Sequence, residues 1–477
     1  MISQGPKHWP HQLEALRFIH KRRGSLLWIP MRAGKTRIAI DYIQNTEPGP
    51  TLIVCPHKVI KVWAAEFEKY LFDSDKFLVK SLSDVSIAER ANVVLECVSI
   101  LNFNNFHNGA NRYPVFIINY DVISEEPLAK QLLKINWQYL IFDECHRLQA
   151  PAGKQSRFAA KLAKNAKKII GLSGTPGNPL GNPQKKEMRA SGIIDIYGVM
   201  RTIAPGLFAY TNQQFKAKYG IWNAFTPFPK IEGYQNQADF DSKFTQVCYH
   251  VDESDLAYTM PEVIEQTRPV KLPASVQAAY DELEKEMVIQ WDDDSLSVEN
   301  ALVKQLRLQQ MTAGFMQMDK DDLPCLVHTE KFDATREIIS DLPESERVIV
   351  FCQFKAEMDE LAAILKSLKR SIFHIRGGID TSDNWKQTPG AILIVQIQAG
   401  GEGLDLSAAN YCIYNSLCHS LRLFQQSFKR PQLPDKKHPV AYYYIVAEGT
   451  IDETIVAALQ AKEEVVDSVR QRLKAKG

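Results

Sequence analysis

Short apolar runs recur along both halves of the chain, and segments with helical spacing separate them. In the first half these runs cover 25–30, 51–56, 115–120, 139–144 and 167–175. In the last third they cover 347–354, 371–378, 391–400, 411–415 and 441–449. Because such runs are apolar on both faces, they are typical of parallel strands that helices cover on both sides. The pattern therefore predicts two α/β domains, each built on a doubly wound parallel sheet.

The middle of the chain, about residues 176–330, interrupts this alternation. It contains turn-rich pieces and then two stretches with helical spacing, 275–291 and 299–315. We interpret this region as helical insertions together with the connection between the two domains. Residues 450–477 have apolar positions at helical spacing behind a threonine–glutamate capping box, which predicts a C-terminal helix.

The length also requires more than one domain, because 477 residues are too many for a single hydrophobic core. We predict an N-terminal domain that covers residues 1–260 and includes a helical insertion at about 177–250. The predicted C-terminal domain covers residues 261–477 and ends in the terminal helix.

Composition and charge narrow the class of protein. The chain is 45% apolar and 24% charged, with a formal net charge of +1, so a nucleic-acid surface would have to be a local basic patch. Its eight cysteines form no C-x-x-C pair, which indicates reduced, buried thiols rather than disulfides or a zinc site. Without an apolar signal segment or a long apolar run, we expect a cytoplasmic protein that does not contact membranes.

The stretch "WIPMRAGKT" after the first apolar run resembles a phosphate-binding loop in which Ile29 replaces the opening glycine. Gly34, Lys35 and Thr36 lie between a predicted strand and a predicted helix. In that position the backbone N–H groups and the dipole at the start of a helix can bind a phosphate group. Lys35 would reach the β- and γ-phosphates and the Thr36 hydroxyl would bind Mg²⁺. The alternative is a helix N-terminus that merely contains this triplet.

Polar residues end two further predicted strands, and the carboxyl ends of parallel strands meet at one edge of a sheet. Asp143 and Glu144 follow the run "YLIF". Asp143 would hold Mg²⁺, and Glu144 would polarise the attacking water. Ser173, Gly174 and Thr175 end the next run, where the hydroxyls can sense the γ-phosphate or connect the acids to the second domain. The alternatives are a solvated acidic turn and a plain β-turn.

The order G-K-T, D-E-C-H and S-G-T resembles the superfamily-two helicase-like ATPases, and more narrowly the Swi/Snf-type DNA-dependent ATPases. The resemblance implies two tandem RecA-like lobes, ATP and Mg²⁺ as cofactors, and DNA as a partner. It also implies that Gln12 in "HWPHQLEALRFI" reads adenine. Arg32 replaces a common glycine of this loop, which is similar to members from phages and prophages and implies a bacterial or phage-infected host cytoplasm. The residues for which the resemblance implies a coupling role are His146, Ser173, Thr175 and Gln426.

The run "ILIVQIQAGGEGLDLSAANYCIYN" resembles the motif that these ATPases carry on the second lobe. Its glycines permit a tight backbone turn. Gly403 and Asp405 are the residues for which the resemblance implies ATP binding, with Asp405 on the ribose or on a neighbouring motif. The resemblance covers nearly the whole chain and is weakest at residues 177–250.

The last motif departs from the family pattern, which expects glutamine, arginine four positions on, and a second arginine three positions later. Here "QSFKRPQLPDKKHPV" supplies Gln426 and Arg430 but has Leu433 at the second position. A register one residue earlier would place Lys429 and Gln432 at the arginine positions, so one cation is absent in either case. An arginine of this kind is worth about 10³–10⁵ in rate in well-studied NTPases. Hydrolysis would therefore be slow unless Arg430 suffices or Arg32 substitutes.

Together with these residues, the resemblance implies an ATP-driven translocase that moves on or remodels duplex DNA without sequence preference. ATP would lie between the lobes, in contact with the loop and the acids of the first lobe and with Gly403, Asp405 and Arg430 of the second. We expect Lys35, Asp143, Glu144 and Arg430 to be catalytic. A loading partner remains unidentified.

The positions that match DNA-contacting motifs of the family are His57, Lys58, Asn119 and Tyr120. The cluster "HKRRG" (20–24) and the lysines of "KLAKNAKK" (161–168) are alternatives, although such runs are often only solvated faces. Two other functions stay open. Leu433 fits a hydrolysis-impaired, ATP-gated DNA-binding protein, and D-E-C-H also occurs among RNA-directed helicases.

Overall fold

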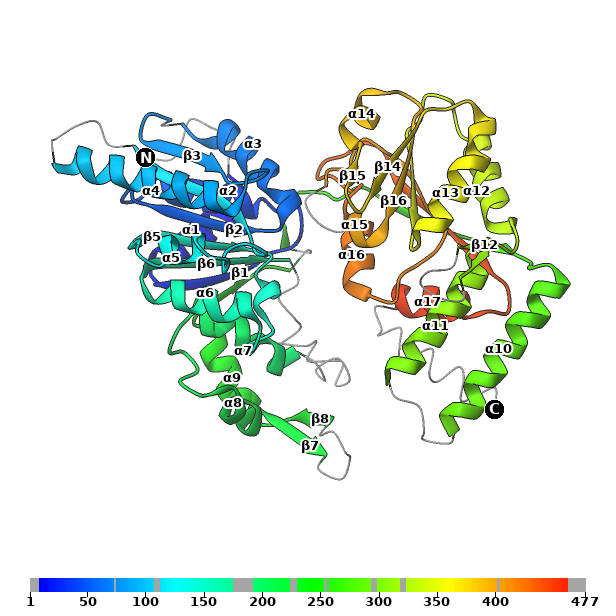
Figure 1. The fold of residues 1–477 in the computed structure, drawn as a ribbon, viewed down its shortest axis with the longest axis horizontal. Coiled ribbons are helices and arrows are strands. Elements are labelled where there is room, and N and C mark those ends of the chain that lie inside the picture. Colours follow the sequence, from blue (N-terminus) through cyan, green and yellow to red (C-terminus); the bar gives the residue numbers. More distant parts are fainter. Residues whose placement is uncertain are drawn as a thin grey trace. The chain divides into compact units, whose positions relative to one another are not determined.

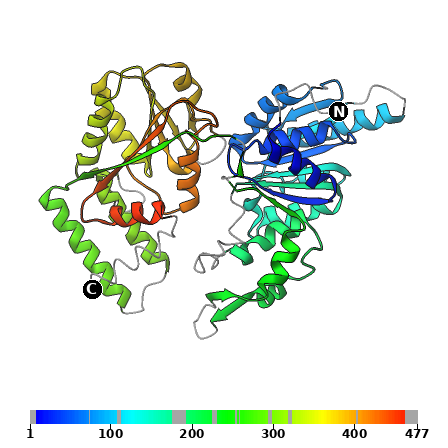
Figure 2. The same ribbon diagram turned by 180° about the vertical axis from the view of Figure 1, so that it is seen from behind.

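The computed structural model describes residues 8–72, 74–106, 112–174, 192–223, 230–252, 255–256, 258–292, 298–317, 323–400 and 404–461. It divides into two compact units, Met1–Ala257 and Tyr258–Gly477. In each unit, helices surround a central sheet (Figures 1 and 2). Each of the three described clusters of buried apolar side chains lies within one unit, so the two units are described separately.

The first unit contains a seven-stranded sheet in the order β3-β4-β2-β5-β6-β1-β9, and its described pairs are all parallel. The strands are β1 (Gly24–Trp28), β2 (Thr51–Cys55), β3 (Phe77–Ser81), β4 (Tyr113–Asn119), β5 (Trp137–Asp143), β6 (Ala166–Ser173) and β9 (Cys248–His250). The apolar runs formed the five interior strands, because residues such as Leu52, Ile53 and Val54 are fully buried.

Helices cover both faces of this sheet (Figure 1). They are α1 (Pro10–His20), α2 (Lys35–Gln44), α3 (Ile60–Tyr70), α4 (Ile87–Phe106), α5 (Leu128–Leu132) and α6 (Lys154–Lys164), with short 3₁₀ turns η1 (His57–Val59) and η2 (Cys145–Leu148) after two strands. Leu52 and Val54 join one apolar cluster with Phe158 of α6. Since side chains alternate along a strand, Ile53 lies on the opposite face.

The described part of the predicted insertion, 192–223 and 230–250, packs beside this sheet as a small helical subdomain. Its elements are α7 (Gly192–Ile203), α8 (Asn212–Tyr219), the hairpin β7 (Gly220–Asn223) and β8 (Lys230–Tyr234), and α9 (Gln237–Phe244). Four aromatic rings, Phe208, Phe215, Tyr219 and Phe240, contact one another at its centre. These rings belong to the same buried apolar cluster as the sheet, so the subdomain shares the core of the first unit.

The second unit contains a second seven-stranded sheet, in the order β10-β18-β17-β13-β16-β14-β15. Its strands are β10 (Val263–Val270), β13 (Val348–Cys352), β14 (Ile372–Arg376), β15 (Ile379–Asp380), β16 (Ile392–Gln396), β17 (Tyr411–Tyr414) and β18 (Val440–Ala447). Every described pair is parallel except the β14–β15 hairpin. The predicted fold class, two tandem doubly wound parallel-sheet lobes, is therefore confirmed.

The second sheet is also surrounded by helices (Figure 2). They are α10 (Ala274–Asp292), α11 (Val298–Thr312), α12 (Glu330–Asp341), α13 (Lys355–Leu365), α14 (Ser382–Gln387), α15 (Ile397–Gly400), α16 (Leu421–Lys429) and α17 (Ile451–Gln460), with the short strands β11 (Phe315–Met316) and β12 (Cys325–Leu326) and the 3₁₀ turn η5 (Lys366–Leu368). α10 and α11 occupy the two stretches predicted as helices. α17 is the described part of the predicted C-terminal helix.

Two absences hold for the part of the chain that the structure describes. None of its helices combines the length and the apolarity that crossing a bilayer requires. No three histidine, cysteine, aspartate or glutamate side chains come together there as metal ligands would. All eight cysteines are free, and each is buried except Cys325.

Candidate nucleotide-binding and catalytic site

The loop between β1 and α2 carries the G-K-T triplet. α2 begins at Lys35, and Gly34 precedes it in a left-handed conformation with φ of 75°. A Cβ atom on Gly34 would lie 2.2 Å from Nε2 of the buried Gln12. The left-handed backbone favours glycine at this position, and the structure brings Gln12 directly against the loop.

Hydrogen bonds fix the start of α1 beside the same loop. The backbone N–H of Trp9 donates to Oε1 of Gln12 at 3.0 Å, which orients the amide. Nε2 of His11 donates to the carbonyl of Ala33 at 2.9 Å. Because burial lowers the pKa of His11, the neutral ring is favoured, and its one proton lies on the nitrogen that faces Ala33. α1 and the loop thus form one ordered unit.

The side chain of Lys35 folds back over the loop. Its Nζ donates to the carbonyls of Ile29 and Pro30, at 3.0 Å each. A Cβ atom on Gly174, at the end of β6, would lie 3.1 Å from Cγ of Met31 and 3.7 Å from Nζ of Lys35. The ammonium group therefore lies where the ends of β1 and β6 meet.

Arg32 has a strained backbone within this loop. Its φ is 65°, a conformation that costs a residue with a Cβ atom about 1–2 kcal/mol. A glycine would adopt it freely, which explains why glycine is common there in the family that the sequence resembles. Arg32 and Thr36 are both partly exposed.

Asp143 ends β5 and is buried. The indole N–H of Trp63 donates to its Oδ2 at 2.9 Å, and the backbone N–H of Glu144 donates to its Oδ1 at 3.0 Å. Burial and the charge of Glu144 raise the pKa of Asp143 to about 6, although Trp63 and the Lys35 ammonium act in the opposite direction. The site therefore holds a desolvated acid whose charge a nearby cation would stabilise.

Glu144, His146 and Ser173 form a connected group. Glu144 has a left-handed backbone, with φ of 47°. Nδ1 of His146 lies 3.3 Å from Oε2 of Glu144 and 3.3 Å from Oγ of Ser173. Ser173 is paired in register with Trp28 of β1, so this group reaches the base of the loop. Thr175 lies outside the described residues.

The four residues predicted to contact DNA differ in exposure. His57 is exposed and Lys58 partly exposed, both in η1 after β2. Asn119 is buried, and its Oδ1 accepts from Arg90 at 3.1 Å. Tyr120 is fully buried and donates to the carbonyl of Asp143 at 2.8 Å. The side chain of Tyr120 thus supports the backbone of Asp143 at the end of β5, and its contact with DNA stays a prediction.

The alternative basic cluster at 20–24 is largely occupied by the fold. Arg23 donates to the carbonyls of Ala163 and Ala166, at 2.9 and 3.1 Å. Arg22 stacks over the ring of Phe18 at 3.6 Å. Nζ of Lys168, from the second basic run, donates to the carbonyl of His20 at 3.0 Å. These cations contact backbone carbonyls and an aromatic ring near the C-terminal end of α1, so they do not form a free basic patch.

In the second unit, Asp405 and Arg430 lie on neighbouring segments. Nη1 of Arg430, which follows α16, donates to the carbonyl of Leu404 at 3.4 Å. The Asp405 carboxylate lies 3.9 Å from Nζ of Lys386 and is about half exposed. The structure thus brings Asp405 and Arg430 to one region of this unit, while Gly403 lies outside the described residues.

The segment after α16 favours the register that places Leu433 at the second arginine position. Asp435 has a left-handed backbone with φ of 60°, as the glycine expected there would. Leu433 is 41% exposed, whereas Gln432 is 1% exposed and donates to the hydroxyl of Tyr442 at 3.3 Å. A buried, hydrogen-bonded Gln432 does not occupy the place of an arginine that reaches a nucleotide. Gln426 is buried in α16.

Comparison with models of known protein families shows which family the chain belongs to. The SNF2-related domain matches residues 11–321, and the helicase conserved C-terminal domain matches residues 330–431. The chain belongs to the SNF2-related family. It is accordingly a helicase-like ATPase, and the predicted relationship and enzyme class are confirmed.

Relatives of this SNF2-related chain occur in phages and in animals. It is 22% identical to the putative protein p41 of Acyrthosiphon pisum secondary endosymbiont phage 1, over 98% of each chain. It is also 22% identical to the DNA annealing helicase and endonuclease ZRANB3 of Mus musculus, over 98% of this chain but 41% of that protein. The chain therefore spans less than half the length of the animal relative.

Among solved structures, the helicase domain of Hef from Pyrococcus furiosus has a TM-score of 0.55 to this chain at 14% identity. The match covers 95% of this chain and 98% of that domain. This likeness shows a shared fold and, together with the two sheets, identifies the units as RecA-like α/β lobes.

Sequence analysis missed one buried acid in the second lobe, Glu357. Its Oε1 accepts from Asn415 at 2.7 Å, and its Oε2 accepts from Ser416 at 2.7 Å and from the backbone of Gln353 and Phe354. Burial raises the pKa of Glu357. The network joins the carboxyl ends of β13 and β17. A polar "YNS" after an apolar run was the one available signal.

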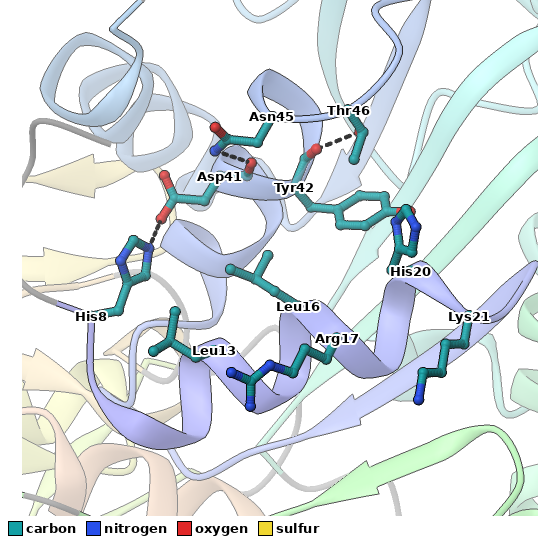
Figure 3. A pocket seen from close by; sticks show the side chains of 10 residues that line it. All are labelled: His8, Leu13, Leu16, Arg17, His20, Lys21, Asp41, Tyr42, Asn45 and Thr46. Carbon is teal, nitrogen blue, oxygen red and sulfur yellow. Dashed lines mark hydrogen bonds and ion pairs between the residues drawn. The ribbon is translucent and has the colours of Figure 1, made fainter. Parts of the chain in front are cut away.

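A cavity of about 540 Å³ lies between α1 and α2 of the SNF2-related lobe (Figure 3). Leu13 and Leu16 point into it, and the hydrogen bond between Nε2 of His8 and Oδ2 of Asp41, 2.6 Å long, lies at one end. None of the residues that line it belongs to the predicted nucleotide site. The cavity is therefore distinct from the loop and the acidic strand end.

Proposed function

We propose that this chain is an ATP-dependent DNA motor that hydrolyses ATP to move on or remodel duplex DNA. Membership of the SNF2-related family supports the use of a nucleotide. The observation that carries the proposal is the meeting of Lys35, Asp143 and the Glu144–His146–Ser173 group at the carboxyl edge of one parallel sheet. Ligands of such sheets bind at that edge.

Each residue of this edge has a role that fits its position. The backbone N–H groups at the start of α2 and the Lys35 ammonium bind the phosphates of ATP. Gln12, held against Gly34, reads the adenine. Glu144 accepts a proton from the attacking water, and its link through His146 to Ser173 reports the state of the phosphates to the rest of the lobe.

Mg²⁺ fits the donor set of this edge. The Thr36 hydroxyl and the Asp143 carboxylate are hard oxygen ligands, and Mg²⁺ commonly takes one or two protein oxygens with phosphates and water completing its shell. The raised pKa of Asp143 shows a carboxylate whose charge a cation would stabilise. When bound, Mg²⁺ would neutralise charge on the β- and γ-phosphates.

The second lobe supplies the other half of the nucleotide site in this proposal. Asp405 and Gly403 contact the ribose side, and Arg430 contacts the γ-phosphate. Gln426, buried in α16 just before Arg430, couples that contact to the lobe. ATP then favours one relative arrangement of the lobes, and hydrolysis releases it.

We propose DNA as the polymer on which the protein moves, in part because the mouse relative is named a DNA annealing helicase. His57 and Lys58, at the surface after β2, are the proposed contacts of the first lobe. Contacts of this kind reach phosphates, so binding would be independent of sequence and would weaken with salt.

The test is phosphate release measured without nucleic acid and with duplex DNA, single-stranded DNA or RNA. We expect duplex DNA to stimulate turnover most, and Lys35→Ala to abolish it. Lys130→Ala, which changes an exposed lysine of α5 outside the proposed site, is the control and should leave the rate unchanged. Stimulation by RNA alone would assign the chain to the RNA-directed class.

A second candidate is an ATP-gated DNA-binding protein with impaired hydrolysis. The exposed Leu433 in place of an arginine favours it. ATP binding together with no turnover under any of the four conditions would select this candidate over the motor.

A further inference from the structure

Six residues other than glycine have a left-handed backbone in the described part of the chain: Arg32, Asp84, Glu144, Asn236, Lys369 and Asp435. Asparagine and aspartate tolerate this conformation because their short side chains bond locally. The three long side chains do not share that advantage. Two of those three, Arg32 and Glu144, lie at the proposed nucleotide edge, and strained residues concentrate where function maintains them.

The neighbours of Arg32 hold its backbone in place. Met31 packs against Gly174 at the end of β6. Ala33 is fully buried, and its carbonyl accepts from His11. Arg32 therefore cannot relax by shifting the loop, and its partly exposed side chain starts three residues before Lys35, the first residue of α2. A cation at this place is near the phosphates of any nucleotide bound there.

The second lobe lacks a cation that the same chemistry needs. Leu433 is exposed at the second arginine position, and the left-handed Asp435 supports that register. A leucine donates no hydrogen bond to a phosphoryl oxygen. One cation is thus missing from the second lobe, and one extra cation stands in the phosphate-binding loop.

We propose that Arg32 supplies in cis the transition-state cation that Leu433 cannot supply from the second lobe. This inference rests on the proposed ATP hydrolysis. The water oxygen forms a bond to the γ-phosphorus while the bond from that phosphorus to the bridging oxygen breaks. ADP leaves with the bridging oxygen and its electron pair, and the water proton passes to Glu144. The Arg32 guanidinium stays protonated and donates N–H groups to the γ-phosphoryl oxygens as their charge is redistributed.

The test uses Arg32→Gly, which removes the cation and relieves the backbone strain. We expect the duplex-stimulated kcat to fall by about 10³-fold or more. ADP affinity should stay within about threefold, because the cation acts mainly in the transition state. Capture of ADP with aluminium fluoride, followed by retention on a desalting column, should be lost. The urea midpoint should rise or stay unchanged.

Lys369→Gly is the matched control. Lys369 is an exposed cation with φ of 56° in the second unit, and it lies outside the proposed site. The same change relieves the same strain and removes one positive charge there. It should leave kcat and aluminium fluoride capture at the wild-type level.

The double variant Arg32→Gly/Leu433→Arg tests the exchange between lobes. We expect the returned arginine to recover at least about tenfold in kcat, a small part of what such a residue supplies elsewhere, and to restore capture of ADP with aluminium fluoride. If the wild-type protein and Arg32→Gly hydrolyse ATP at the same rate, this inference is overturned, but the proposed motor function stands. Equal losses of ADP affinity and kcat would also overturn it, since Arg32 would then only bind nucleotide. A wild-type chain without turnover would remove the proposed function itself.

Discussion

At the residue scale, the candidate site depends on a few hydrogen bonds to buried charge. The Asp143 carboxylate is desolvated, and the Trp63 indole is one of two donors that hold it. A buried carboxylate that loses a donor keeps its desolvation cost without the compensating bond. Trp63, which enters the site from α3, is therefore a positioning residue for Asp143.

We expect Trp63→Phe to lower the free energy of unfolding by about 1–3 kcal/mol and duplex-stimulated phosphate release by about 10- to 100-fold. Urea unfolding and phosphate release measure the two effects. Trp137→Phe is the control, because Trp137 is equally buried and donates its indole N–H to the carbonyl of Leu132 at 3.1 Å. Trp137→Phe should lower the free energy of unfolding by a similar amount and leave the rate of phosphate release unchanged. Equal loss of rate in both variants would show that general packing, rather than the bond to Asp143, sets the activity.

The residues at the loop and the acidic strand end could be predicted from spacing, because each follows an apolar run that forms an interior strand. Tyr120 could not be assigned in this way. Its ring lies in the core, and its hydroxyl reaches a carbonyl 23 residues further along the chain. Motif position alone cannot tell a buried tyrosine from an exposed one, since burial is set by helices distant in sequence.

At the element scale, the apolar runs predicted every interior strand of the two large sheets and missed the edge strands β3, β9, β10 and β15. An interior strand is buried on both faces and reads as a continuous apolar run. An edge strand such as β10 has six consecutive exposed residues, and charged or polar residues at an edge discourage pairing with other chains. The pattern of hydrophobicity therefore reports burial rather than strand structure itself.

The junction of α1 with the phosphate-binding loop leads to a prediction for Gly34→Ala. The new Cβ atom would meet the Gln12 amide at 2.2 Å. We expect nucleotide affinity to fall by at least about tenfold, equivalent to about 1.4 kcal/mol. We also expect stability to fall by about 1–2 kcal/mol from the left-handed backbone. Titration with a fluorescent ATP analogue and urea unfolding measure the two quantities.

Gly206→Ala is the control that separates the effect of the clash with Gln12 from the effect of the left-handed backbone. Gly206 has φ of 96°, and a Cβ atom there would meet nothing within 4 Å. This variant should lose about as much stability as Gly34→Ala does, and its nucleotide affinity should stay at the wild-type level. Unchanged affinity in Gly34→Ala would mean that Gln12 does not contact the nucleotide.

At the scale of the whole molecule, each unit has the parts of an independent domain. One unit contains a parallel sheet, its helices and an apolar cluster from Leu26 to Cys248. The other contains its own sheet and two clusters that lie between Leu272 and Leu459. The proposed nucleotide contacts, however, are divided between the units. The described apolar clusters are thus local to each lobe, whereas the proposed hydrolysis would require both lobes.

This division predicts the behaviour of residues 1–257 and 258–477 produced as separate chains. We expect each to unfold cooperatively in urea, since none of the described apolar clusters takes residues from both units. The first chain should still bind a fluorescent ATP analogue, because the loop, Gln12 and the acids are all within it. Neither chain alone should release phosphate at the rate of the intact protein. A mixture at micromolar concentration should also stay slow, because a covalent connection provides an effective concentration in the range of about 1 mM. Full turnover by the first chain alone would mean that Arg430 and Asp405 take no part in hydrolysis, and the second lobe would then act only on DNA.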